Sequence, residues 1–132
     1  MIPDPKLHHA AFRIAPNSLE RLYDMLALFG VKELYRQPGA RWAMVGQDWL
    51  DFNIQLIETD SAALQGDARL SSQISFISED PETHIAQVEA WAKSKNIIFV
   101  KGSWSEREHW FDLQDFFNDS VIEVMHVSIL ND

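Results

Sequence analysis

The chain has 132 residues, the length of one ordinary domain, and 46% of them are hydrophobic, including eight Phe and five Trp. This is enough apolar material for a packed core, which excludes an intrinsically disordered protein. The chain also has no cysteine and a formal net charge of -9. These features exclude disulfides and thiolate metal ligands, and they disfavour nucleic acid and anionic membranes as partners. We expect a globular protein that binds a small molecule.

The N-terminal residues lack the basic and apolar stretches of a secretory signal peptide. No apolar run approaches the roughly 18 residues that cross a bilayer. The absence of cysteine agrees with a reducing compartment. The sequence therefore predicts a cytoplasmic protein without membrane association.

The first half of the chain combines signals for one helix and several strands. A strand is predicted at residues 7–14, and a helix follows from Asn17, which forms a pattern like a capping box with Glu20, to Gly30. Three further strands with tight connections are predicted at residues 31–37, 40–45 and 50–58. The order is strand, helix and three strands, or βαβββ.

The second half repeats this order. Residues 59–69 are small and polar without a sustained period, which predicts a linker. A strand at residues 70–77 precedes a helix that Asp80 and Pro81 begin. Three last strands are predicted at residues 97–100, 108–113 and 121–129. Equivalent positions keep a nearly constant offset, for example 64 between His9 and Gln73 and 68 between Gln55 and Glu123. This indicates an internal duplication.

Four strand motifs resemble those of a known superfamily. They are Leu7-His8-His9-Ala10-Ala11-Phe12-Arg13-Ile14, Asn53-Ile54-Gln55-Leu56-Ile57-Glu58, Gln73-Ile74-Ser75-Phe76-Ile77 and Val121-Ile122-Glu123-Val124-Met125. They are similar to the first, fourth, fifth and eighth strands of the vicinal oxygen chelate superfamily, which includes glyoxalases, bleomycin-resistance proteins and ring-cleaving dioxygenases. The resemblance implies an α+β fold in which two βαβββ modules, related by a pseudo-twofold duplication, form a curved mixed sheet and a ligand-holding cup.

The expected organisation is a single domain over residues 1–132. The first module spans about residues 7–58, the linker residues 59–69 and the second module about residues 70–129. Relatives build their cup either within one chain or across a dimer. The sequence does not decide between these, although its aromatic content favours a homodimer.

In metal-binding members of the superfamily, each of the four strands supplies one ligand. The resemblance therefore implies a divalent metal site formed by His9, Gln55, Gln73 and Glu123. Strand alternation places each of them opposite the apolar face of its strand. Nitrogen and oxygen donors suit a hard or borderline divalent ion, but the two Gln amides are weaker donors than carboxylate or imidazole. A bound metal and a cup without any cofactor both remain open. The two-His-one-carboxylate triad of non-haem iron enzymes cannot be assembled from these four positions, which argues against a ring-cleaving dioxygenase.

Other residues are candidates for contact with the substrate. Glu123 is an acidic residue within an apolar strand, which favours a catalytic role in moving a proton. If no metal is present, Arg13 is its expected partner. The predicted substrate-binding residues are those that share the cup face or mix aromatic character with charge near the seventh strand: Arg13, Asn53, Ser75, Trp104 and Trp110. His84 on the second helix is expected at the surface.

Three functions follow from these features. The first is a metal-dependent lyase, isomerase or transferase of the glyoxalase type that acts on a small oxygenated metabolite. The second is a metal-free binding protein of the bleomycin-resistance type, which sequesters a cationic aromatic compound and agrees with the acidic charge and the five Trp. The third is a partner module without ligand activity.

Overall fold

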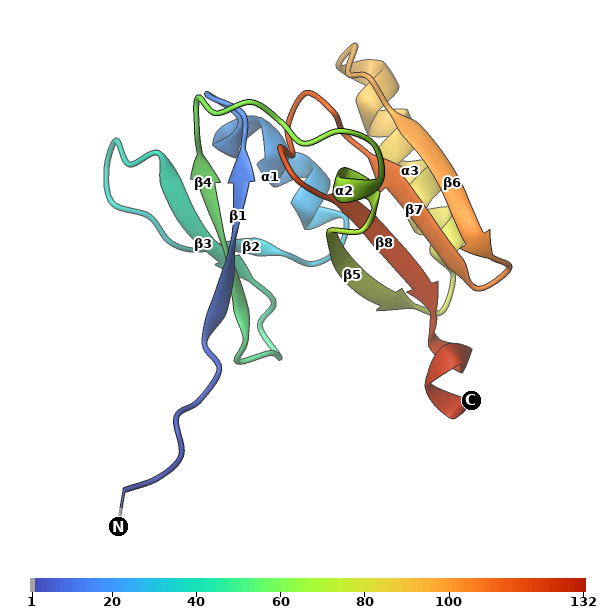
Figure 1. The fold of residues 1–132 in the computed structure, drawn as a ribbon, viewed down its shortest axis with the longest axis horizontal. Helices are drawn as coiled ribbons and strands as arrows, with labels where there is room; N and C mark the ends of the chain where they lie inside the picture. Colours follow the sequence, from blue (N-terminus) through green and yellow to red (C-terminus); the bar gives the residue numbers. More distant parts are fainter. Residues whose placement is uncertain (1) are drawn as a thin grey trace.

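The computed structural model describes residues 2–132 as two four-stranded mixed sheets with a helix packed against each (Figure 1). In chain order the elements are β1 (His9–Ile14), α1 (Leu19–Ala27), β2 (Lys32–Tyr35), β3 (Trp42–Gly46), β4 (Asn53–Glu58), α2 (Gly66–Leu70), β5 (Gln73–Ser78), α3 (Pro81–Ser94), β6 (Val100–Ser105), β7 (Glu108–Asp112), β8 (Val121–His126) and a 3-10 helix, η1 (Val127–Asn131). Within residues 2–132, no helix has both the length and the apolar character that crossing a bilayer demands.

The two sheets have the same topology. Their strand orders are β1-β4-β3-β2 and β5-β8-β7-β6. In each sheet the first strand of the module pairs in parallel with the last, and the other pairs are antiparallel. The α+β class and the two similar βαβββ modules are therefore confirmed, with the eight strands divided between two sheets (Figure 1).

Aromatic rings join the two modules in one core. Phe29, which follows α1, stacks on Phe76 of β5 with 4.4 Å between ring centroids and on Phe111 of β7 with 6.2 Å. The backbone also joins the modules, because Ile14 of β1 forms an isolated β-bridge with Phe117 of the second module. Because the buried residues of both modules form a single cluster, removal of either module would expose the apolar face of the other.

The predicted capping box at the start of α1 is wrong. Asn17 has φ 60, a left-handed conformation that Asn tolerates, so it forms the turn before the helix. Ser18 is the N-cap, but its side chain makes no capping hydrogen bond. The backbone N–H of Leu19 instead donates to Glu58 Oε2 at 3.1 Å. A carboxylate from β4 therefore performs the capping that local sequence predicts for Asn17.

The start of α3 follows the prediction. Asp80 is the N-cap and accepts a hydrogen bond from the backbone N–H of Thr83, and Pro81 is the first helical residue. These contacts are local, so the sequence pattern is sufficient to locate them.

The linker and two strands of the second module differ from the prediction. The strand predicted at 97–100 is β6, which begins at Val100 and continues to Ser105, whereas Ile97 is buried in the core before it. Residues 66–70 of the expected irregular linker form the helix α2. The last strand ends at His126, whose side chain accepts a hydrogen bond from Ser128 N and so begins η1. The first of these shifts places Trp104 within a strand.

Candidate functional site

Glu123 lies near the centre of the second sheet and is only 6% exposed. Strand pairing places it between Ser75 of β5 and Trp110 of β7. Its Oε1 accepts a hydrogen bond from Ser75 Oγ at 2.9 Å. No salt bridge within residues 2–132 neutralises its carboxylate. A buried carboxylate with one neutral donor is unfavourable unless a cation completes its surroundings.

A groove of about 610 Å³ opens above Glu123. Its lining residues come from α2, the following turn and the second sheet: Asp67, Leu70, Ser71, Gln73, Trp104, Glu108 and Glu123. The lining includes three carboxylates but no Lys, Arg or His. The groove therefore has the electrostatic character of a site for a cation.

Trp104 lines this groove, and a second tryptophan packs against it. Trp104 and Trp110 stack with 5.5 Å between ring centroids and 26° between ring planes, and Trp104 is 43% exposed. Trp110 packs directly over Gly102, where a Cβ atom would lie 2.5 Å from its ring. The structure thus brings together the predicted site residues of the second module, which are Gln73, Ser75, Trp104, Trp110 and Glu123.

The predicted site residues of the first module lie on the other sheet. His9 is exposed, pairs in register with Asn53, and has its Nδ1 2.9 Å from that of His8. Gln55 lies between Ala11 and Met44 on the same sheet. In the part of the chain described, neither His9 nor Gln55 lines the groove of Glu123 or hydrogen-bonds to it. The chain also contains, over residues 2–132, no group of three or more His, Asp or Glu that could hold a metal ion.

Arg13 has a different partner from the one predicted. Its Nε and Nη2 atoms donate to the two carboxylate oxygens of Asp119, each at 2.6 Å. The hydrogen bonds that Arg13 donates to Asp119, together with the negative charge of Asp119, raise the pKa of Arg13 above the usual value. The prediction that Arg13 neutralises Glu123 is therefore wrong. Asp119 lies two residues before the start of β8, and its position next to β1 depends on how the modules pack.

Asp67 was not among the residues predicted for the site. It lies on α2, in the segment that was expected to be irregular. The sequence signal for this short helix was weak. It consisted of the acidic Asp67 in the first turn and the basic Arg69 in the last turn. Arg69 is buried against Asp112, and this tertiary contact holds α2 at the edge of the groove.

His84 is another residue whose surroundings differ from the prediction. It is half-buried, and its ring stacks on Phe29 with 5.6 Å between centroids. Its Nδ1 is buried and has no hydrogen-bond partner among residues 2–132. His84 is therefore part of the contact between the modules and not a surface residue.

Comparison with solved structures identifies the class of fold. A possible glyoxalase from Bacillus cereus superposes with a TM-score of 0.60 at 14% sequence identity, covering 91% of this chain and 97% of that one. The trypanothione-dependent glyoxalase I of Leishmania major gives 0.59 at 13% identity, covering 97% and 91%. The fosfomycin resistance protein FosX from Listeria monocytogenes, solved with Mn(II) and a dihydroxypropylphosphonic acid, gives 0.60 at 16% identity, covering 95% and 93%.

The chain therefore has the fold of the vicinal oxygen chelate superfamily, as its strand motifs predict. No protein-family model and no curated protein sequence matches the chain. The likeness is thus one of structure at low sequence identity, and it establishes the fold without assigning an activity.

Proposed function

We propose that this protein is a glyoxalase-like vicinal oxygen chelate enzyme that binds a divalent metal ion through Glu123 and acts as a lyase, isomerase or transferase on a small oxygenated metabolite. The observation that carries the proposal is the state of Glu123, a carboxylate that is 6% exposed and whose hydrogen bond within residues 2–132 comes from the neutral Ser75 hydroxyl. A divalent cation would supply the missing positive charge. The structure of FosX, which has a similar fold, was solved with Mn(II), and this supports the proposal.

The donor atoms of the second module fit a metal ion. Gln73 and Glu123 line the same groove. Gln73 Nε2 donates to the carbonyl of Leu70 at 3.2 Å, which leaves Oε1 as the free donor atom of the amide. Ser75 fixes Oε1 of Glu123, so Oε2 is the carboxylate oxygen available to a ligand or a proton. These residues provide two of the four expected ligands.

The other two expected ligands, His9 and Gln55, are on the first sheet, and the groove lining includes no residue of that sheet. We infer that the set is completed in a homodimer. In that arrangement His9 and Gln55 of one protomer face Gln73 and Glu123 of the partner subunit. The exposure of His9 leaves its ring accessible for this contact.

Within such a site, each group has a distinct chemical role. The metal would act as a Lewis acid on the paired oxygens of the substrate. Glu123 is the group placed to accept a proton from the substrate, since its carboxylate is held in one orientation by Ser75. Trp104 offers an exposed aromatic face that orients a planar substrate.

The test of the metal site compares metal content after purification without chelator. We expect a stoichiometric divalent ion in the wild-type protein and its loss in Glu123→Ala. Glu106→Ala is the matched control, because Glu106 belongs to the turn between β6 and β7 and does not line the groove. Equal metal content in wild type and Glu123→Ala would contradict the proposal.

Mixed dimers test whether the site crosses the subunit boundary. Neither His9→Ala nor Glu123→Ala protein should bind metal alone. A heterodimer of the two variants contains two sites, and in one of them both residues are intact. Mixing the two variants after mild unfolding should therefore restore metal binding at one site of each heterodimer that forms. No restoration would indicate a site within one chain.

A metal-free binding protein for a cationic aromatic compound is the second candidate. It is favoured by one observation, the combination of three carboxylates with an exposed Trp in a groove of about 610 Å³. Charge attraction and stacking on Trp104 would together hold such a ligand. Thermal-shift measurements on chelator-treated protein separate the candidates, because a cationic aromatic dye should raise the unfolding midpoint without metal. α-Keto or diol metabolites should do so only with metal.

A further inference from the structure

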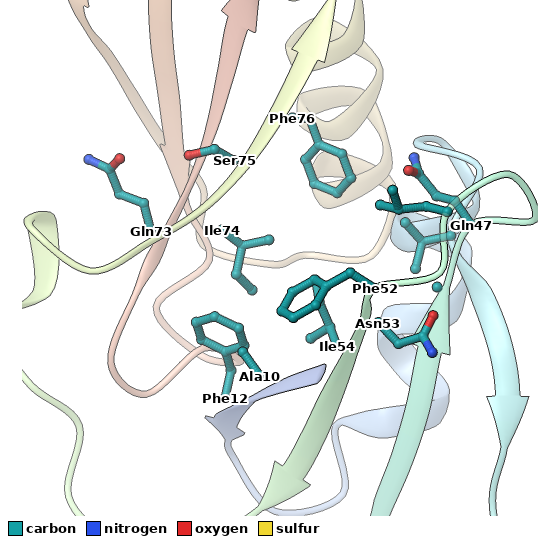
Figure 2. Close-up of a pocket in the computed structure, with 13 residues that line it drawn as sticks. Ala10, Phe12, Gln47, Phe52, Asn53, Ile54, Gln73, Ile74, Ser75 and Phe76 are labelled. Carbon is teal, nitrogen blue, oxygen red and sulfur yellow. The ribbon is translucent and has the colours of Figure 1, made fainter. Parts of the chain in front are cut away.

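A second cavity lies between the two modules and differs in character from the groove of Glu123. It encloses about 250 Å³. Figure 2 shows side chains from both sheets around it, with Phe12 and Ile54 on one side, Ile74 and Phe76 on the other, and Phe52 between them. A cavity of about 150 Å³ with apolar walls is sufficient to hold benzene. This cavity therefore has room for a larger aromatic molecule.

The cavity wall contains no Asp, Glu, Lys, Arg or His. Its polar side chains are those of Gln47, Asn53, Gln73 and Ser75. Three of them have their donor groups engaged elsewhere, since Gln47 Nε2 donates to Phe29 O at 2.9 Å, Gln73 Nε2 donates to Leu70 O at 3.2 Å and Ser75 Oγ donates to Glu123. A charged ligand would find no countercharge here, so the wall selects a neutral molecule.

Asn53 differs from the other polar residues of the cavity wall in its hydrogen bonding. Its Oδ1 is buried and has no hydrogen-bond partner within residues 2–132. The amide lies against Gly46, where a Cβ atom would be 2.6 Å from Oδ1 and 2.8 Å from Leu34 Cδ1. Gly46 and Asn53 both line the cavity. A buried acceptor without a donor is rare in native proteins, and rotation of the amide toward the cavity would allow a bound molecule to donate to it.

We propose that this cavity is a binding site for a neutral aromatic molecule of one or two rings that carries a single hydrogen-bond donor directed at Asn53 Oδ1. The rings of Phe12, Phe52 and Phe76 supply the stacking surfaces, and Asn53 selects ligands with an N–H or O–H group. Neither Glu123 nor His9 lines the cavity, so the inference does not require a bound metal ion. Gln73 belongs to the linings of both the cavity and the groove.

The test uses indole and N-methylindole as a matched pair of probes on chelator-treated protein. Calorimetry should show that indole binds about tenfold more tightly, since only indole can donate to Asn53. Asn53→Leu, which keeps the side-chain size but removes the acceptor, should abolish this preference. In two-dimensional NMR spectra, indole should shift the side-chain amide resonance of Asn53. Glu123→Gln should leave indole binding unchanged, which separates this inference from the proposed metal site.

Two variants that fill the cavity complete the test. Ala10→Phe adds a ring to the wall, and Phe52→Trp enlarges a ring that is already 37% exposed and therefore tolerates the change with less risk to folding. Either variant, if its circular dichroism spectrum matches that of the wild type, should lose indole binding. Equal affinity for the two probes, or unchanged indole binding in a folded filling variant, would overturn the inference. Indole binding that appears only when a homodimer is diluted would also overturn it, because the cavity would then be part of a subunit interface.

Discussion

Arg69 of α2 and Asp112 of β7 form a buried ion pair with two parallel hydrogen bonds, of 2.9 Å from Nε to Oδ2 and 2.7 Å from Nη2 to Oδ1. Their side chains are 5% and 7% exposed. Arg69 Nη1 also donates to the carbonyl of Asn118 at 2.8 Å. The pair attaches the linker to the second sheet and so places Asp67 and Leu70 at the groove.

We predict that Arg69→Ala lowers the free energy of unfolding by about 3–5 kcal/mol, because it leaves the charge of Asp112 buried and without a partner. Urea denaturation measures this change. The double variant Arg69→Met/Asp112→Leu should recover most of the loss, since it removes both charges and retains apolar volume. A single variant as stable as the wild type would show that the pair contributes little.

Ser75→Ala tests the role of the hydroxyl that holds Glu123. We expect metal affinity to fall by about 10–100-fold, because a residue that orients a metal ligand contributes to binding without touching the ion. Isothermal titration with Mn(II) or Zn(II) measures the change. Ser71→Ala is the control, since Ser71 lines the same groove but its hydroxyl donates to Ala68 O. Equal losses in the two variants would assign the effect to the groove in general and not to the contact with Glu123.

Gly102→Ala tests the tryptophan pair. The added methyl group would lie 2.5 Å from the Trp110 ring, so the ring has to move. We expect a destabilisation of about 1–3 kcal/mol from overpacking, a change in the near-ultraviolet circular dichroism of the tryptophans, and weaker binding of cationic aromatic dyes. Ser103→Ala changes the exposed neighbouring residue and should have none of these effects. An unaltered tryptophan spectrum in Gly102→Ala would contradict the packing of Trp110 over Gly102.

The ionisation of Tyr23 gives a pH prediction. Burial and then the hydrogen bond that its hydroxyl donates to Glu33 raise the pKa of Tyr23 from 10.0 to about 12. Since this folded-state pKa lies above the unfolded value, Tyr23 stabilises the fold fully below pH 10 and loses that contribution as the pH rises toward about 12. Tyr35→Phe leaves Tyr23 as the only tyrosine, so ultraviolet titration of that variant reports its pKa directly.

Glu33→Gln in the Tyr35→Phe background is the comparison for this titration. This substitution removes the negative charge that opposes the ionisation of Tyr23 and weakens the hydrogen bond of the Tyr23 hydroxyl. The pKa of Tyr23 should therefore be lower than in the Tyr35→Phe parent. An unchanged midpoint would mean that burial alone sets the pKa of Tyr23.

Local pattern was sufficient to predict the order of the eight strands and the two longer helices, and the faces of the strands. Ile122 and Val124 are buried in the core while Glu123 between them faces the groove, which is the alternation that a period of two requires. The helix beginning at Asp80 and Pro81 was equally predictable, because its cap contacts lie within three residues. Repetition of these local signals at a nearly constant offset was enough to indicate two modules.

Contacts between distant segments were decided only by the tertiary structure. The partner of Arg13 is Asp119, 106 residues away, and the partner of Arg69 is Asp112, 43 residues away. The cap of α1 comes from Glu58 on β4, and Trp110 of β7 covers Gly102 of β6. None of these has a local signature, since each depends on which surfaces meet when the modules pack. The sequence by itself determined which side chains share a face of each strand, whereas the packing of the two sheets decided which of those faces lie together in one chain.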